Sequence, residues 1–341
     1  MDKNLRILIT GASGLVGSSI LGKLSALDQF EIIVVTGKRS ITTKDNNKRI
    51  DKFYQVDISD EQTFGQVEEL KAIDILIHAA GLAHQFGDTE KKDFWRVNVK
   101  GVKNICKLAV KLQVKHFLLI SSVAVYGNYG KTIVDETFKC QPRGFYAESK
   151  LEGEKIAIEI CEKKKIALTI FRLGTVIGEG DHGNVSRLMT IIDKGRFYWI
   201  GNGENKKSLI YKEDVAEAVL SLIKNKKNGT EIFNLSAEPI TMREIVDSIA
   251  ENLCKKLPRI RVSNNLLQKI FRFNEKSFKL DKLIKLKEAI QKWISDDIYA
   301  GQKLFEKYSF KPLTTISGAL EKQVKFYLST KRKQRVKKVS K

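Results

Sequence analysis

The chain has 341 residues, of which 42% are hydrophobic and 30% are charged, a balance typical of a folded protein. No uncharged apolar run of about 18 residues occurs, which argues against a membrane-spanning helix, and the N-terminus lacks the apolar segment of a signal peptide, so we expect a cytoplasmic location. The formal net charge of +21 indicates a basic surface that attracts anions.

Short apolar strands alternate with amphipathic helices through the first half of the chain. Because such strands are buried on both faces and need helical crossovers, the alternation predicts an α/β fold with a Rossmann-type, doubly wound parallel sheet. The predicted strands are Leu5–Thr10, Glu31–Thr36, Lys52–Asp57, Asp74–His78, Phe117–Ser121 and Ala167–Leu173. The predicted helices between them are Leu15–Ala26, Glu61–Leu70, Asp93–Leu112 and Phe145–Lys163.

The alternation becomes irregular after residue 174. One more helix and strand follow at Val215–Lys224 and Glu231–Leu235, and Thr241 with Glu244 has the spacing of a capping box that begins another helix. We therefore predict a dinucleotide-binding Rossmann domain at 1–174, to which 212–236 return. A smaller, mixed α/β C-terminal lobe at 175–330 would bind substrate, and 331–341 form a basic tail.

The first predicted strand and helix are joined by a glycine-rich segment, Thr10 to Gly17. Gly11 permits a tight turn, Gly14 lets the backbone approach a pyrophosphate, and Gly17 allows the helix to pack closely on the sheet. The N-terminus of the helix would direct N–H groups at the anion. The predicted cofactor contacts here are Gly11, Ser13, Gly14, Leu15, Val16 and Gly17.

The residues after the second predicted strand bear on the choice between NAD and NADP. Lys38 and Arg39 stand where an acidic residue would bind the ribose hydroxyls of NAD. Two cations can bind a 2′-phosphate instead, which favours NADP. Both residues are also explained as loop charges in a lysine-rich chain, so NAD stays open.

A serine, a tyrosine and a lysine have the spacing of a catalytic group. Tyr146 and Lys150 are one helical turn apart and therefore share a helix face. A neighbouring ammonium and an oxidised nicotinamide ring would lower the pKa of the phenol from its usual value near 10. Lys150 can also hold the cofactor ribose, and Ser122, at a strand end, can donate a hydrogen bond to a substrate oxygen that gains charge.

These residues resemble the motifs of the extended short-chain dehydrogenases/reductases, which include nucleotide-sugar epimerases, dehydratases and reductases. The resemblance covers about residues 5–328. The matching segments are Thr10–Gly17, Asp57–Ile58, His78–Gly81, Asn98–Gly101, Ser121–Gly127, Tyr146–Lys150, Phe171–Gly178, Gly183–Leu188 and Asn205–Tyr211.

The resemblance implies a role for each matching residue. Asp57 and Ile58 would flank the adenine, Ala79, Ala80 and Gly81 would run beside the cofactor, and Asn98 would fix the backbone of the active site. Tyr146 would be the acid and base, and Ser122, rather than Ser121, would polarise the substrate oxygen. Substrate contacts would be Ser122, Asn184 and Lys207, the last two to a nucleotide diphosphate.

Two positions depart from the family pattern. Leu173 stands where proline commonly follows the arginine, and Lys207 stands where arginine is usual, so a bidentate grip on the diphosphate becomes a point charge. Family members often dimerise through paired helices, and here a homodimer would use the helices at 93–112 and 145–163.

The resemblance leaves two reactions open. Family dehydratases carry an Asp-Glu pair directly after the serine or threonine, whereas Val123 and Ala124 stand here and neither can move a proton, which disfavours 4,6-dehydration. A 4-epimerase would keep NAD tightly bound, and a 4-ketoreductase would exchange NADPH. The segment from Gly183 to Tyr211 resembles that of members acting on UDP-N-acetyl sugars in surface-polysaccharide precursor synthesis.

Other interpretations remain. The chain could be a non-catalytic, NAD(P)-sensing Rossmann protein that binds nucleic acid through its basic surface, although the intact Ser122, Tyr146 and Lys150 argue against it; we expect no dedicated nucleic acid partner. The basic-apolar segment 264–273 would cover the lobe or touch an anionic membrane surface, as the tail also could. We predict free thiols and no metal site, because the four cysteines are widely spaced and His84 and His182 lack partners at ligand spacing.

Overall fold

The computed structural model describes residues 5–37, 49–83, 89–130, 132–225, 228–259, 261–262, 290 and 293–339, the last seven of these without their side chains. The predictions for Lys38, Arg39, His84 and the segment 264–273 lie outside the described residues.

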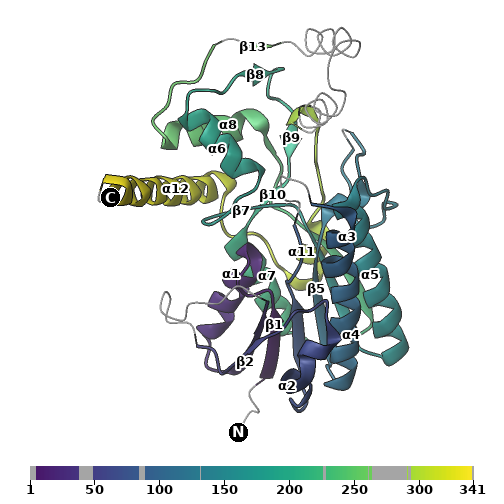
Figure 1. Cartoon of the computed structure of the whole chain (residues 1–341). Coiled ribbons are helices and arrows are strands. Elements are labelled where there is room, and N and C mark those ends of the chain that lie inside the picture. The colour runs from purple at the N-terminus through teal and green to yellow at the C-terminus, as the bar shows by residue number, and fades with distance from the viewer. Residues whose placement is uncertain are drawn as a thin grey trace.

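Seven parallel strands form the central sheet, in the order β11-β6-β5-β4-β1-β2-β3. Figure 1 labels β1, β2 and β5 of this sheet. The strands are β1 (Leu5–Thr10), β2 (Phe30–Thr36), β3 (Lys52–Gln55), β4 (Ile75–His78), β5 (His116–Ser122), β6 (Ala167–Leu173) and β11 (Thr230–Leu235). The chain runs outward from β1 to β3 and then returns to β4, so the direction of winding switches between β1 and β4. The predicted doubly wound sheet is confirmed, and ligands of such sheets bind at this switch point.

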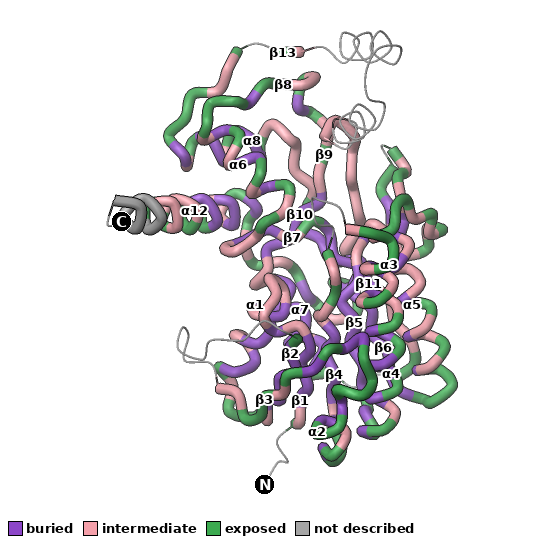
Figure 2. Tube along the Cα trace, in the orientation of Figure 1, coloured by how far each residue is buried: buried purple, intermediate pink, exposed green. Residues whose placement is uncertain are grey.

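Helices cover both faces of the sheet. Ile7 and Ile9 of β1 pack with α1 and α7, whereas Leu8 packs with α4 and α5 on the opposite face, because successive side chains of a strand alternate. Buried residues accordingly follow the central strands in Figure 2. The α-helices are α1 (Leu15–Ser25), α2 (Gly65–Glu68), α3 (Lys91–Phe94), α4 (Gly101–Lys111), α5 (Phe145–Lys164), α6 (Asn184–Asp193), α7 (Lys212–Ile223), α8 (Met242–Asn252), α11 (Gln302–Tyr308) and α12 (Ile316–Val339).

The lobe has its own apolar core, in which α6, α8 and α12 pack together. Three pairs of short strands accompany it: β7 (Thr175–Ile177) with β10 (Leu209–Tyr211), β8 (Trp199–Ile200) with β13 (Arg261–Val262), and β9 (Lys206–Lys207) with β12 (Ile240–Thr241). The predicted capping box is present, since Thr241 and Glu244 bond to each other's backbone N–H at the start of α8. The domain boundaries themselves stay predictions, although β11 does pair with β6.

Beyond shifts of one to three residues at the ends of other elements, three predicted elements differ from the structure in kind. Residues 61–68 form a 3-10 turn, η2 (Glu61–Phe64), followed by α2, because glycine at 65 weakens a continuous helix. The helix predicted at 93–112 begins at Lys91 and contains a π-helical segment, η3 (Trp95–Lys100). The basic tail continues α12 as far as Val339, as expected for a run of good helix formers.

Candidate active site

The glycine-rich loop between β1 and α1 has no room for larger residues. Gly11 has φ of +75°, and a Cβ there would lie 2.3 Å from the Ala80 nitrogen. A Cβ on Gly17 would lie 2.2 Å from the Gly11 oxygen. No side chain caps α1 at Gly14, so the first N–H groups of the helix are left for an anionic ligand. The loop therefore fits the pyrophosphate of a dinucleotide.

The end of β4 lies beside this loop. His78 is buried, and its Nδ1 is 2.6 Å from the Thr10 Oγ1. Burial, together with the charge of Lys150, lowers the pKa of His78 to about 3, so the ring stays neutral. Among the described residues its Nε2 has no hydrogen-bond partner. His78 is a packing residue rather than a base, and Ala79 to Gly81 follow it along the loop.

Asp57 and Ile58 follow β3 at the same edge of the sheet. The Asp57 carboxylate accepts hydrogen bonds from the N–H and hydroxyl of Ser59, at 2.9 and 2.7 Å. The Ile58 side chain is buried against Gly101, where a Cβ would lie 2.9 Å from its Cδ1. Asp57 is thus oriented by its neighbour, while Ile58 also belongs to the sheet's core.

Asn98 lies in η3 and holds the chain after β4. Its Oδ1 accepts a hydrogen bond from the Leu82 N–H at 2.8 Å, and its amide donates to the Leu82 carbonyl and the Ser149 hydroxyl, each at 3.0 Å. A Cβ on Gly81 would lie 3.3 Å from the Asn98 Oδ1 and 3.9 Å from the Lys150 Nζ. The structure therefore brings Gly81, Asn98 and Lys150 together beside the predicted cofactor path.

Ser122, Tyr146 and Lys150 also come together, from the end of β5 and the start of α5. The Ser122 hydroxyl lies close enough to the Tyr146 phenol to lower its pKa. The Lys150 ammonium donates to the Ile120 carbonyl at 2.6 Å, two residues before Ser122. The catalytic group predicted from the spacing is thus assembled in space.

The adjacent serines of β5 have different partners. Ser121 donates to the Glu154 carboxylate, which forms a buried ion pair with Arg172 at 2.7 Å. Ser122 instead faces Tyr146, because neighbouring residues of a strand point to opposite faces. The sequence analysis did not identify Glu154 as the partner of Ser121 and Arg172, although Glu154 lies one helical turn after Lys150.

The protein environment of Tyr146 by itself raises the pKa of its phenol. Desolvation raises this pKa, and the neighbouring Ser122 hydroxyl opposes the rise. The same desolvation lowers the pKa of Lys150 to about 8, against the opposing charge of Glu154. Burial therefore favours the neutral forms of both groups more than the spacing alone suggested.

The two predicted diphosphate contacts lie in the lobe. Asn184 is the first residue of α6 and is exposed. Lys207 lies in β9, and its Nζ forms an ion pair with the Asp297 carboxylate at 2.6 Å. Asp297 was missed because the two residues are 90 positions apart and nothing local marks the pairing.

Neither a membrane span nor a metal cluster is found in the part of the chain that the structure describes. No helix there has the length and hydropathy needed to cross a bilayer. The described His, Cys, Asp and Glu side chains form no group of three that could hold a metal ion.

A doubly wound sheet, a glycine loop at its switch point and a Ser-Tyr-Lys group define an NAD(P)-dependent enzyme of the short-chain dehydrogenase type. The sequence profile of the NAD dependent epimerase/dehydratase family matches residues 7–236, and the chain belongs to this family.

Three known proteins illustrate the similarity. The N-acetyl-α-D-glucosaminyl-diphospho-ditrans,octacis-undecaprenol 4-epimerase of Escherichia coli O157:H7 is 31% identical over 76% of each chain. The UDP-glucose 4-epimerase of Vibrio cholerae is 29% identical over 73% of this chain and 76% of its own. The structure of the Thermus thermophilus UDP-glucose 4-epimerase in complex with NAD superposes with a TM-score of 0.74, at 20% identity, over 95% of this chain and 99% of the other.

Proposed function

We propose that the chain is a 4-epimerase that acts on a nucleotide-activated, N-acetylated sugar, most simply a UDP-N-acetyl sugar, in the synthesis of surface-polysaccharide precursors. The observation that carries this proposal is the grouping of Ser122, Tyr146 and Lys150 where the end of β5 meets the start of α5. Val123 and Ala124 follow Ser122 in place of an acidic pair, which disfavours elimination of water.

Each residue of this group has a definite task in the proposed reaction. The nicotinamide ring, when bound, supplies a reversible acceptor for hydride. As a phenolate, which the positive charges of Lys150 and of a bound, oxidised nicotinamide would favour, Tyr146 accepts the proton of the sugar C4 hydroxyl during oxidation and returns it during reduction. Ser122 donates a hydrogen bond to the same oxygen, and Lys150 supplies positive charge beside Gly81, where the cofactor ribose would lie.

The loop residues would hold the cofactor. Gly11, Ser13, Gly14, Leu15, Val16 and Gly17 cradle its pyrophosphate, Asp57 and Ile58 flank its adenine, and Ala79 to Gly81 run beside it. Asn98 supports this path through Leu82. In the lobe, Asn184 and Lys207 would contact the substrate diphosphate.

The relatives support C4 chemistry and leave the carrier of the sugar open. Two are named as 4-epimerases, one of a UDP-sugar and one of an undecaprenyl diphosphate sugar. The 4-ketoreductase interpretation and the preference for NADP depended on Lys38 and Arg39, which lie outside the described residues. The homodimer and the cytoplasmic location also stay predictions.

The proposal is tested by incubating the purified protein with UDP-N-acetylglucosamine and NAD and following the anomeric signals of the sugar by NMR. The expected result is the C4 epimer, approaching the same equilibrium mixture when the reaction starts from UDP-N-acetylgalactosamine. NADPH-dependent reduction of a UDP-4-keto sugar, with no interconversion of the two epimers, would contradict the epimerase and support the ketoreductase.

A further inference from the structure

A buried ion pair joins α5 to β6 next to the candidate catalytic group. The side chains of Glu154 and Arg172 are only 1% and 6% exposed. The Arg172 Nε donates to both carboxylate oxygens at 3.2 Å, and its Nη2 donates to one of them at 2.7 Å. The Ser121 hydroxyl donates to the same carboxylate. The carboxylate is therefore held from two strands, in which Ser121 and Arg172 stand directly opposite each other.

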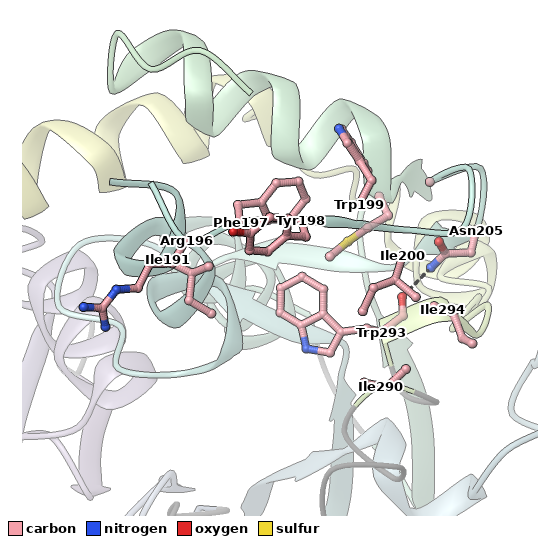
Figure 3. Close-up of a pocket in the computed structure, with 12 residues that line it drawn as sticks. Ile191, Arg196, Phe197, Tyr198, Trp199, Ile200, Asn205, Ile290, Trp293 and Ile294 are labelled. Atoms are coloured by element: carbon pink, nitrogen blue, oxygen red, sulfur yellow. Dashed lines mark hydrogen bonds between the residues drawn. The ribbon is translucent and has the colours of Figure 1, made fainter. Parts of the chain in front are cut away.

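The burial of this pair calls for a reason other than stability. Two charges lose their water when they are buried, and replacing a buried pair by apolar residues is often neutral for stability or even favourable. In the lobe, a charged residue avoids this cost. Arg196 lies in the lining of an apolar pocket, yet it is exposed and its side chain points away from the pocket (Figure 3). Glu154 and Arg172 instead stay inside the protein, beside the group that carries out the proposed reaction.

Glu154 lies where its charge can act on Lys150. The two residues are one turn apart on α5 and share a face of the helix. The Lys150 ammonium is fixed by its bond to the Ile120 carbonyl at 2.6 Å, and the next residue of β5, Ser121, bonds to the Glu154 carboxylate. Desolvation lowers the pKa of Lys150 to about 8, and the charge of Glu154 opposes this effect.

Three neighbouring titratable groups supply no lasting charge. His78 of β4 lies near Lys150, and burial lowers the pKa of its ring to about 3, so the ring is neutral. Burial raises the pKa of the Cys140 thiol, which adjoins Glu154 and stays protonated. Burial also raises the pKa of Tyr146, so its phenol carries a charge only when a bound nicotinamide favours the phenolate. Glu154 thus gives Lys150 a negative neighbour whether or not the phenol is ionised.

We propose that Glu154 is a positioning residue whose carboxylate, held by Ser121 and Arg172, keeps Lys150 in the positively charged state that the reaction at C4 requires. The inference rests on the proposed function, because it gives Glu154 a task in that reaction. The charge of the carboxylate is what matters, and the hydroxyl of Ser121 adds one hydrogen bond to a group that the guanidinium already grips.

The experiment compares the pH dependence of kcat/KM for the epimerisation of UDP-N-acetylglucosamine in the wild type, Glu154→Gln and Ser121→Ala. Glu154→Gln keeps the size of the side chain and removes its charge, so the pKa of Lys150 should fall by about one unit or more. The ammonium then loses its proton at lower pH, and the alkaline decline of kcat/KM should begin about one pH unit earlier than in the wild type. Ser121→Ala is the matched control: it keeps the carboxylate, and its decline should coincide with that of the wild type.

The size of the effect should depend on pH. Relative to the wild type, Glu154→Gln should lose about tenfold in kcat/KM at about pH 8 and little at about pH 6, where both proteins keep the ammonium. A purely structural role would lower the activity equally at both values. Coinciding profiles for Glu154→Gln and the wild type would overturn the proposal and leave the epimerase intact, whereas no epimer from the wild type would defeat the proposed function.

A change of background shows whether Glu154 acts through Lys150. In Lys150→Arg the guanidinium stays protonated without help, so adding Glu154→Gln should no longer move the decline. A decline that still moved would mean that Glu154 acts on another group, which contradicts the proposal. A reading without substrate is the NMR titration of isotope-labelled lysine side chains, in which the signal lost in Lys150→Arg should titrate at lower pH in Glu154→Gln.

A further variant guards against loss of the fold. Glu154→Gln leaves the Arg172 charge buried without its partner, which destabilises a protein more than removal of both charges does. Urea unfolding checks the single variant, and where it does not fold, Glu154→Gln combined with Arg172→Met takes its place. The decline should again begin at lower pH than in the wild type, and an unchanged profile in this folded variant would equally overturn the proposal.

Discussion

The sheet and the lobe position their candidate residues in different ways. In the sheet, Ser122 and Lys150 are held by contacts between neighbouring elements, β5 and α5, that pack directly together. In the lobe, Lys207 depends on Asp297, and the loop after β7 depends on Gln323, which lies 142 residues from its partner Asp181. The comparison teaches that substitutions in the sheet should affect the chemical step, whereas substitutions in the lobe should affect binding or stability.

The largest expected effect is that of Tyr146→Phe, which removes the phenol hydroxyl that faces Ser122. Activity on the sugar diphosphate should fall about 10²–10⁴-fold in kcat, the usual contribution of a positioned acid or base. The matched control is Tyr327→Phe, which removes a hydroxyl bonded to Asp193 in the lobe. Equal kcat values for the two variants would break the distinction between sheet and lobe.

The two serines of β5 allow a sharper comparison within the sheet. Ser122→Ala should lower kcat about 10²-fold or more, because a donor to the developing oxyanion is lost. Ser121→Ala removes only a hydroxyl bonded to the buried Glu154 and should cost about 1–3 kcal/mol of stability with little change in kcat. Urea unfolding and steady-state rates on both variants measure this, and a reversed pattern would mean that Ser121 is the catalytic residue.

The pKa of Lys150 predicts the alkaline limit of the reaction. Burial lowers this pKa to about 8, so the ammonium loses its proton, and its positive charge, as the pH rises through that value. If the charge is required, kcat/KM should decline above about pH 8, by about tenfold per unit, as for any single essential acid. In Lys150→Arg the guanidinium stays protonated, and the decline should move to higher pH. An identical decline in the variant would assign it to another group.

The architecture of the sheet could be predicted because its signals are local. Apolar runs marked the strands, and the limits of β1 and β6 agree with the prediction to the residue. The glycine loop could be identified because backbone clashes exclude other residues at Gly11 and Gly17. The grouping of Ser122, Tyr146 and Lys150 could be predicted because Ser122 ends a strand and because Tyr146 and Lys150 lie one turn apart on a helix.

The remaining features could not be predicted from local patterns. The π-helical turn that contains Asn98 packs closely on α5, where a Cβ on Gly153 would lie 2.6 Å from the Asn98 backbone carbonyl oxygen. The pairing of Lys207 with Asp297 joins distant segments. The pKa of Tyr146 depends on how far the assembled site excludes water, which spacing along a helix does not reveal.

The smallest expected effect is that of replacing Gln323, a residue of the lobe whose side-chain amide is buried. Gln323 of α12 accepts a hydrogen bond from the Gly178 N–H at 3.0 Å and donates to Asp181 and Ser186, at 3.1 and 2.9 Å. Gln323→Ala leaves these groups without their partner and should cost about 1–3 kcal/mol in the free energy of unfolding, because buried polar groups lose their compensation. Gln302→Ala, which removes a bond to Glu306 on the surface, is the matched control and should change stability little. Since the segment from Gly178 to Ser186 contains Asn184, KM should rise while kcat stays within about twofold of the wild type, as expected when only uniform binding is lost. A loss of kcat with KM unchanged would mean that α12 also affects the chemical step. It would contradict the expectation that substitutions in the lobe affect only binding or stability.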